Sequence, residues 1–600
     1  MDVYKRLEEK INELIERVKQ LDTEDVLGYI GAMLFAGKTG NLFELTGLSS
    51  PIKQLLYLGG LLLSTPEPQT KIEFNEKRYN ELTTLLEEIA NTYSLLFFPD
   101  EEEMKQGLSE QWKKSREVTM PVFLHYFNTV SLSYEEQQLL RIEKWFLPFN
   151  EQVEQEVGVS VQDILEWYSF VKESFKKPFE NTKVLNDQYQ KEIINFFETA
   201  SKEGLGFEEI MPKITKTKAT NLALQLVENV SLLFHISIDD MKQRFGEEKS
   251  NRLIEIFSIK REQRDFRYYT EKNPFEIAPL WRKSPNYLMC LEPKLLLNAI
   301  YDFLYSVMES SQYKNSWYKR RDIETENQTV EIIRGLFGNQ AEYFTSVFEN
   351  DKSQNEHDVL VIYKDTILIV EVKASKFKEP FRDPDKAYVR IKRDFRSDGG
   401  IQKAFEQGLN LKKLLLSNDS TNLYNQKGEV IKTIYKEDIK NVFIICLTAE
   451  DTGIVGTNLS LLLEKPEDEP FPWACNLYDF STLIDAFIYK KLSPEKFIEY
   501  LSSRQRLHER FLSTDELEIA GFYLRYGSFQ QLEKSSATHY FLTPDMSDIF
   551  DEIYFEKNGV EFETDAYCQH DEFLDKFIDF LEANGWHFGG GTKADRYRGE

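Results

Sequence analysis

The chain has 600 residues, of which 41% are hydrophobic and 14% aromatic, and this supply of core material excludes an intrinsically disordered protein. The chain contains 74 Lys and Arg residues and 101 Asp and Glu residues, so its formal net charge is −27. Such a charge excludes general, sequence-independent attraction to nucleic acid, and any nucleic-acid contact would need a local basic patch or a partner protein.

Residues 1–285 are predicted to form a mostly helical region. Residues 4–21 place Leu7, Ile11, Leu14, Ile15 and Val18 on one helical stripe. Helical periodicity recurs over residues 79–95, 134–146, 161–175, 188–200 and 219–233. Prolines cluster between 270 and 290 and indicate a connection into the next domain. We expect this region to regulate the protein or to mediate assembly, with a protein partner or with itself.

A β-hairpin is predicted next, at residues 359–370. Two runs of β-branched and aromatic residues, 359–363 and 366–370, flank a plausible two-residue turn at Lys364-Asp365. Nearly continuous apolar strands are typical of a sheet buried on both faces, as in an α/β domain. A turn at 364 and 365 also pairs position 358 with position 371.

Charged residues stand at the open end of this hairpin. Asp358 precedes the first strand, and Glu371-Val372-Lys373 ends the second. Strand alternation puts Glu371 and Lys373 on one face of the sheet, and the register brings Asp358 beside them. Two carboxylates can hold Mg²⁺ next to a phosphate, and an amine can orient water or offset negative charge.

This arrangement resembles the PD-(D/E)xK phosphodiesterases, the restriction-endonuclease-like nuclease superfamily, and is most similar to nuclease-related domains and exonuclease-type members. The resemblance implies that Asp358, Glu371 and the carbonyl of Val372 bind Mg²⁺ or Mn²⁺ and that Lys373 positions the attacking water. His357 stands where the family often has proline, and we expect it to be a neighbour of the site, not a ligand.

Two helices extend the resemblance. Family members usually carry a glutamate upstream of the hairpin, and Glu326 shares a helical face with the apolar residues of the segment up to 337, which favours it over Glu331. Some members carry a glutamine on the following helix, here Gln407 within residues 401–416. For both residues the alternative is an ordinary solvated or structural helix position.

A basic stretch follows the hairpin between residues 371 and 396, interleaved with aromatic residues. Positive charge attracts phosphate and aromatic rings can stack on bases, so this stretch is the candidate substrate contact. The residues proposed to bind substrate are Lys376, Lys378, Arg390, Lys392, Arg393 and Arg396. The alternative is a solvated loop and helix.

Downstream, residues 440–447 are predicted to form a buried strand, 473–479 a further strand and 482–489 a helix. These elements would complete a mixed α/β core. The predicted fold is therefore multi-domain α plus α/β. Its parts are a helical regulatory or assembly region at 1–285, a restriction-endonuclease-like mixed-sheet domain at 286–490, and a mixed, partly helical extension at 491–600.

The four cysteines, Cys290, Cys446, Cys475 and Cys568, are far apart, so zinc and a disulfide framework are not indicated. Scattered thiols suit a reducing cytoplasm. The start of the chain is charged, unlike a signal peptide, and the longest apolar run, residues 55–63, is too short to span a bilayer. We expect a cytoplasmic protein without a membrane partner.

The leading hypothesis is a Mg²⁺- or Mn²⁺-dependent nuclease that hydrolyses phosphodiester bonds, DNA being favoured over RNA. A large helical module joined to a small nuclease also resembles effectors of prokaryotic defence against phage or foreign DNA. Two alternatives stay open: a non-catalytic scaffold or binding protein with a nuclease-like core, and a nuclease directed at RNA.

Overall fold

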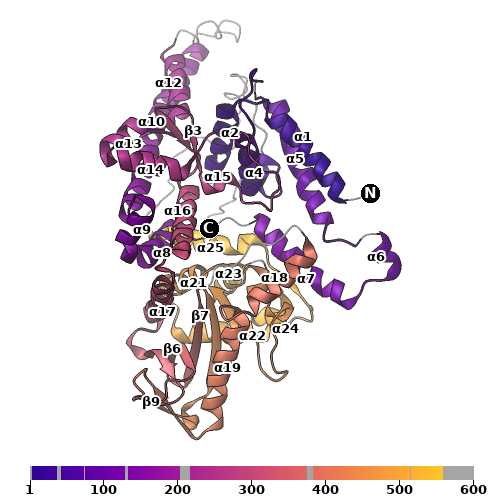
Figure 1. Ribbon diagram of the computed structural model, residues 1–600, viewed down its shortest axis with the longest axis vertical. Coiled ribbons are helices and arrows are strands. Elements are labelled where there is room, and N and C mark those ends of the chain that lie inside the picture. Colours follow the sequence, from indigo (N-terminus) through magenta and orange to yellow (C-terminus); the bar gives the residue numbers. More distant parts are fainter. Residues whose placement is uncertain are drawn as a thin grey trace. The chain divides into compact units, whose positions relative to one another are not determined.

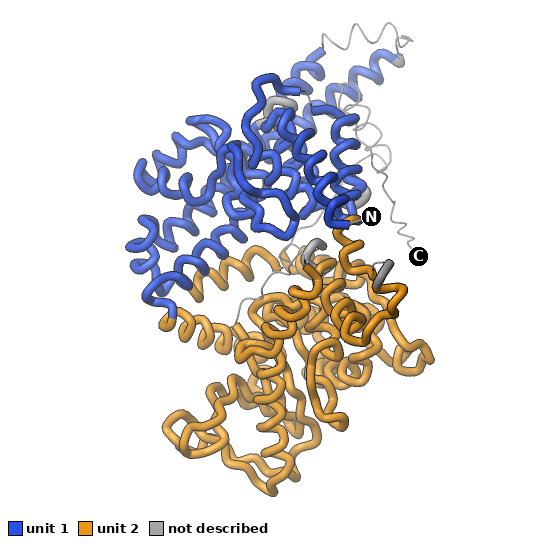
Figure 2. The backbone as a smooth tube through the Cα atoms, turned by 45° about the vertical axis from the view of Figure 1, so that its right-hand side comes forward, with its two compact units in different colours: residues 1–91, 146–314, 568–600 blue, residues 92–145, 315–567 orange. Residues whose placement is uncertain are grey.

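The computed structural model describes residues 3–36, 42–72, 74–99, 101–128, 133–202, 217–374, 383–513 and 515–558. Its contacts divide the chain into two compact units, each assembled from separate stretches of sequence (Figure 2). Unit 1 takes the described parts of 1–91 and 146–314, and unit 2 those of 92–145 and 315–567. The predicted domain ranges 1–285, 286–490 and 491–600 stay a prediction.

The chain is a large α/β protein, helical up to about residue 230 and then built of mixed sheets interleaved with helices, as predicted at this coarse level (Figure 1). The helices of unit 1 are α1 (Val3–Val18), α2 (Thr23–Ala36), α3 (Leu42–Thr46), α4 (Pro51–Leu63), α9 (Asn150–Val157), α10 (Val161–Lys202), α12 (Lys218–Leu232), α13 (Ile238–Phe245), α14 (Glu247–Phe257), α15 (Pro274–Ile277) and α16 (Pro293–Ser310). Helix α5 (Glu76–Leu95) runs across the division between the units.

Unit 1 also contains a small four-stranded sheet that the sequence analysis missed. Its order is β1-β4-β3-β2. The strands are β1 (His235–Ser237), β2 (Ser258–Ile259), β3 (Leu280–Arg282) and β4 (Tyr287–Cys290). Strands of two to four residues are too short to show alternation in the sequence, which is why a helical region was expected here.

Unit 2 surrounds a seven-stranded sheet. Its helices are α6 (Glu101–Gln106), α7 (Glu110–Asn128), α8 (Glu135–Phe146), α17 (Lys314–Phe337), α18 (Pro384–Phe395), α19 (Ile401–Ser417), α20 (Ile454–Thr457), α21 (Leu477–Tyr489), α22 (Pro494–Arg506), α23 (Glu516–Tyr526), α24 (Gln530–Lys534) and α25 (Asp548–Lys557). The sheet strands are β5 (Glu342–Phe348), β6 (Glu356–Tyr363), β7 (Thr366–Lys373), β8 (Ser420–Tyr424), β9 (Val430–Tyr435), β10 (Asn441–Thr448) and β11 (Trp473–Asn476). A separate pair is formed by β12 (Phe511–Leu512) and β13 (Tyr540–Phe541).

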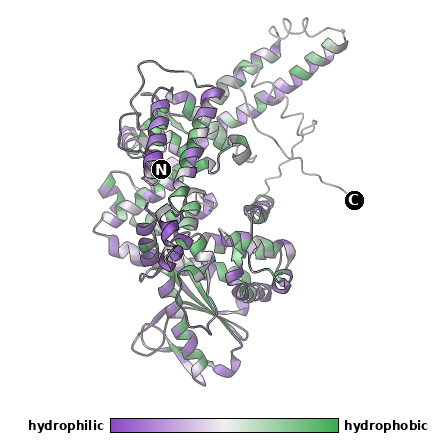
Figure 3. Ribbon diagram, turned by 90° about the vertical axis from the view of Figure 1, so that its right-hand side faces the viewer, coloured by the Kyte–Doolittle hydropathy of each residue, from purple (hydrophilic) through white to green (hydrophobic). Residues whose placement is uncertain are grey.

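The large sheet is mixed, with the order β11-β10-β7-β6-β5-β8-β9. Strand β7 pairs antiparallel with β6 and parallel with β10, so it lies where the two kinds of pairing meet. The predicted hairpin is confirmed: Tyr363 pairs with Thr366 and Val359 with Val370, which is the register of a two-residue turn at Lys364-Asp365. In Figure 3 the central strands are coloured as hydrophobic over much of their length.

Helices cover both faces of this sheet. On one face, Val359, Val361, Leu368 and Val370 pack in a core with residues of α17, α21, α22 and α23. On the other, Leu360 and Ile369 pack against α19. Nearly continuous apolar strands in the sequence are explained by this burial on both sides.

Glycine allows α19 to lie close to the sheet. A Cβ atom at Gly408 would come within 2.7 Å of Cγ2 of Ile444 and 3.6 Å of Cγ2 of Ile369. Because real Cβ contacts essentially never fall below 3.0 Å, only glycine fits here without a shift. The helix is thereby held against β7 and β10, with the neighbouring residue Gln407 near the strand ends.

One strand boundary differs from the prediction. Strand β11 ends at Asn476, not at residue 479, because the Asn476 side chain accepts a hydrogen bond from the Asp479 amide and caps α21. The predicted strand at 440–447 is confirmed as β10. Across the described ranges, no helix is long and apolar enough to cross a membrane.

Candidate active site

The open end of the β6–β7 hairpin brings the predicted site residues Asp358, Glu371 and Lys373 together on the α19 side of the sheet. The Val372 amide donates a hydrogen bond to Oδ2 of Asp358 at 2.6 Å. Nζ of Lys373 lies 3.9 Å from the same oxygen. Asp358 is therefore held at the strand end by backbone and lysine, in the register expected from the sequence.

Helix α19 adds Gln407 to this group. Nζ of Lys373 donates a hydrogen bond to Oε1 of Gln407 at 2.8 Å. The amine thus has two anchors, an amide oxygen on α19 and a carboxylate on β6. A lysine restrained in this way is pre-organised to contact a ligand at the strand ends.

Glu371 is the most buried member of the group, with 0% of its surface exposed. Its Oε1 is 2.7 Å from Nδ1 of His357, whereas Oε2 is buried and has no hydrogen-bond partner in the described part of the chain. Burial raises the pKa of Glu371 to about 7, assisted by the charge of Asp358 and opposed by His357 and Lys373. A buried carboxylate oxygen without a partner is costly, and a bound cation or an ordered water would satisfy it.

His357 lies between two carboxylates. Its Nε2 is 3.1 Å from Oε1 of Glu349, which in turn accepts a hydrogen bond on Oε2 from the Asn355 side chain at 2.7 Å. Burial alone would lower the pKa of His357, but the hydrogen bonds to Glu349 and Glu371 raise it to about 9. The imidazolium form donates from both ring nitrogens, one to each carboxylate.

Helix α17 brings Glu326 near the same strand end. Burial, followed by the charges of Asp358, Glu356, Asp322 and Glu371, raises the pKa of Glu326 to about 8. Glu331, the weaker candidate in the sequence analysis, is exposed on the same helix. The Glu326 carboxyl is thus close enough to the hairpin acids for their charges to raise its pKa, and its role as an accessory acid stays a prediction.

Asp358 and Glu371 offer carboxylate oxygens, the type of ligand that suits a hard divalent cation. Burial also raises the pKa of Asp358, although Lys373, the Val372 amide and His357 lower it. Hard cations such as Mg²⁺ take oxygen ligands and need only one or two protein carboxylates. In the residues that the structure describes, no group of three or more His, Cys, Asp or Glu could hold a metal. The protein would supply Asp358 and Glu371, and the carbonyl role of Val372 stays a prediction.

The predicted substrate-binding residues are only partly described. Lys376 and Lys378 lie outside the described residues. Arg393 is exposed on α18 and Lys392 lies over the Tyr388 ring at 5.9 Å. Arg390, on the same helix, is half-buried.

Arg396 has partners within the protein, since its guanidinium donates to the Leu462 carbonyl at 3.1 Å and pairs with Glu464 at 2.7 Å. Phe395, one of the interleaved aromatic residues, packs in the core and does not present its ring to solvent. A role of this stretch in substrate binding stays a prediction.

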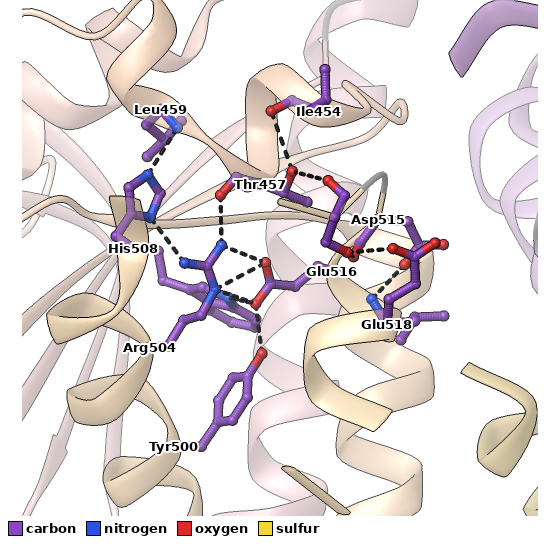
Figure 4. A network of polar contacts seen from close by, with 12 residues as sticks. Ile454, Thr457, Leu459, Tyr500, Arg504, His508, Asp515, Glu516 and Glu518 are labelled. Atoms are coloured by element: carbon purple, nitrogen blue, oxygen red, sulfur yellow. Dashed lines mark hydrogen bonds and ion pairs between the residues drawn. The ribbon is translucent and has the colours of Figure 1, made fainter. Parts of the chain in front are cut away.

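A second polar cluster in unit 2 has a different character (Figure 4). Arg504 and Glu516 form a buried ion pair at 3.0 Å, and Glu516 also accepts hydrogen bonds from Tyr500 and the Trp473 indole. Arg504 further donates to the Thr457 carbonyl at 2.6 Å. Because both charges have partners on all sides, this cluster joins α22 and α23 to the sheet core and is structural.

Glu349 was not singled out from the sequence. It follows β5, a strand that the sequence analysis did not predict, and nothing in its local pattern separates it from the other acidic residues of a strongly acidic chain. Only the pairing of β5 with β6, which sets Val347 opposite His357, brings it to the site. Comparison with models of protein families and with curated proteins gives no match to this chain, so the geometry alone carries the functional argument.

Proposed function

We propose that this chain is a Mg²⁺- or Mn²⁺-dependent nuclease with a PD-(D/E)xK-type site, acting on DNA. The observation that carries the proposal is the group of Asp358, Glu371 and Lys373 on one sheet face, with the buried Oε2 of Glu371 unpartnered among the described residues. The mixed sheet, the glutamate on α17 and the glutamine on α19 support the finer assignment to a restriction-endonuclease-like fold.

The positions of the side chains support a distinct role for each. Asp358 and Glu371 would hold the cation, which polarises a phosphoryl oxygen and lowers the pKa of a bound water. Lys373, held by Gln407, would orient the attacking water and offset the negative charge that develops on phosphorus. Glu326 would act as the accessory acid beside Asp358.

Displacement at phosphorus would proceed in line, so hydrolysis would invert its configuration. The fold would contribute chiefly by fixing the positions of Asp358, Glu371 and Lys373 before substrate binds. The hairpin register and the close packing of α19 against the sheet at Gly408 provide this rigidity. DNA is the proposed substrate, and RNA is an outcome of the same test.

The scaffold alternative has one observation in its favour. The net charge is −27, and Arg396, a predicted phosphate contact, is already paired with Glu464. A scaffold, however, gains nothing from a buried, unpartnered carboxylate oxygen at Glu371, which costs folding free energy. The association with defence against foreign DNA rests on analogy and stays a prediction.

Cleavage of supercoiled plasmid, linear duplex, single-stranded DNA and RNA tests the proposal. Each substrate is incubated with Mg²⁺, Mn²⁺ or EDTA and with wild type, Lys373→Ala or Lys364→Ala. Lys364, 61% exposed at the other end of the same hairpin, provides the matched control. We expect metal-dependent cleavage that Lys373→Ala abolishes and Lys364→Ala preserves. Equal cleavage by wild type and Lys373→Ala would refute the proposal.

A further inference from the structure

The carboxylate of Glu371 is held in place by His357, a residue that is not itself a proposed metal ligand. Oε1 lies 2.7 Å from Nδ1 of His357, and both side chains are buried, with exposures of 0% and 1%. A glutamate has several rotatable bonds, and fixing one oxygen restricts where the other can lie. The contact therefore determines the place of Oε2, the oxygen without a partner in the described chain.

His357 is itself fixed by a second layer. Its Nε2 meets Oε1 of Glu349 at 3.1 Å, and Oε2 of Glu349 accepts from Asn355 at 2.7 Å. Asn355 has φ +54°, in the left-handed region that asparagine tolerates better than most residues. The contacts form a continuous chain from the loop before β6, through the end of β5, to Glu371 on β7.

The backbone explains why the imidazole can reach Glu371. His357 pairs with Val347 across β5 and β6, and Val347 packs in the core on the α19 face of the sheet, the face on which Glu371 lies. Ligands of metals are commonly held by hydrogen-bonded neighbours, and loss of such a neighbour typically costs metal affinity without removing a ligand.

We propose that His357 is a positioning residue that orients the Glu371 carboxylate so that Oε2 faces the cation site, with Glu349 and Asn355 fixing the imidazole. The inference rests on the proposed function, since it assigns a role toward the same cation. It predicts that the geometry of the hydrogen bond at Nδ1, and not the bulk of the ring, sets the affinity for metal.

Two substitutions separate these contributions. In His357→Asn the amide nitrogen takes the position of Nδ1 along the side chain and can still donate to Glu371. In His357→Gln the amide nitrogen corresponds to Nε2 and can reach only toward Glu349. Both keep a polar side chain in the buried place, so a purely structural role of the ring predicts that both change the protein alike.

The experiment is binding of Mn²⁺ alone to the full chain without nucleic acid, followed by the electron paramagnetic resonance signal of free Mn²⁺. Urea unfolding in EDTA is measured alongside. We expect His357→Gln to lose about tenfold to a hundredfold in Mn²⁺ affinity. We expect His357→Asn to keep an affinity close to wild type while losing as much stability as His357→Gln.

Equal Mn²⁺ affinity in folded His357→Gln and wild type would overturn the inference and leave the proposed function intact. Equal losses in both variants would also overturn it, in favour of a structural ring. If His357→Gln does not fold, Glu349→Ala decides: a weaker Mn²⁺ affinity supports the inference and an unchanged one overturns it. If wild type binds Mn²⁺ no better than Asp358→Asn, the proposed function fails as well.

Discussion

Replacing Glu371 by glutamine should make the metal-free protein more stable while removing its response to metal. The buried carboxyl has a pKa of about 7, against an ordinary value of 4.5. That difference corresponds to a destabilisation of about 3 kcal/mol when the group is ionised in the folded state. Glutamine keeps the shape of the side chain without the charge.

The pH dependence has a defined sign. The folded-state pKa lies above the unfolded value, so the destabilisation is absent below about pH 4.5, grows as the pH rises through 7 and is complete above it. The attraction of His357 for the carboxylate is already contained in this pKa and needs no separate correction. The gain in Glu371→Gln should therefore be up to about 3 kcal/mol at pH 8 in EDTA and smaller at pH 6.

Hydrogen exchange of peptides covering β7 measures this locally, which is useful because the chain has two units and need not unfold in one step. Mn²⁺ at about a hundred times its dissociation constant should stabilise wild type by about 2.7 kcal/mol and leave Glu371→Gln unchanged, reversing their order. A Glu371→Gln protein less stable than wild type in EDTA at pH 8, or equally stabilised by Mn²⁺, would refute the reasoning.

Two further predictions concern the frame of the site. Gly408→Ala should destabilise unit 2 by about 1 to 3 kcal/mol in urea unfolding, because the new Cβ would lie 2.7 Å from Ile444 and overpack the contact of α19 with the sheet; a stability equal to wild type would contradict the close approach. Arg504→Met should cost about 3 to 5 kcal/mol because it leaves the Glu516 carboxylate buried without its cation. Adding Glu516→Leu should recover part of that loss, and a double variant less stable than Arg504→Met would show that the ion pair is not what the core depends on.

The hairpin and its register were predictable because they depend on local sequence. Two apolar runs of strand length separated by two residues favour a single register, that of a two-residue turn. The same register sets Asp358 opposite Glu371. Helical periodicity also favoured Glu326 over Glu331, and Glu326 is the more buried of the two, while its role in the site stays a prediction. The coarse order of helical region and mixed α/β region was predictable for the same reason.

Features that depend on distant partners were not predictable. Residues 161–202 form one helix, α10, with Pro178 inside it, although the sequence pattern predicted two shorter helices. The buried pair of Arg504 and Glu516 gives no sign in the sequence, where charged residues indicate a surface. Glu349 reaches the site only through strand pairing between β5 and β6.

Association of α7 with the sheet unit also required the structure. Val118 and Val122 of this helix pack in one core with Ala387 and Ile391 of α18, more than two hundred residues later in the chain. Arg116 adds an ion pair with Asp385 at 2.7 Å. No local pattern in residues 110–128 identifies such a partner, so the segment was assigned to the helical region.

The most direct test of the central claim is the single-turnover rate of duplex DNA cleavage with Mn²⁺, compared between wild type and Asp358→Ala. Asp358 is the carboxylate that accepts from the Val372 amide and lies nearest Lys373. We predict metal-dependent cleavage by wild type and a loss of about a hundredfold or more in the variant, with unchanged folding by circular dichroism. Cleavage by folded Asp358→Ala at the wild-type rate would contradict the assignment of this site.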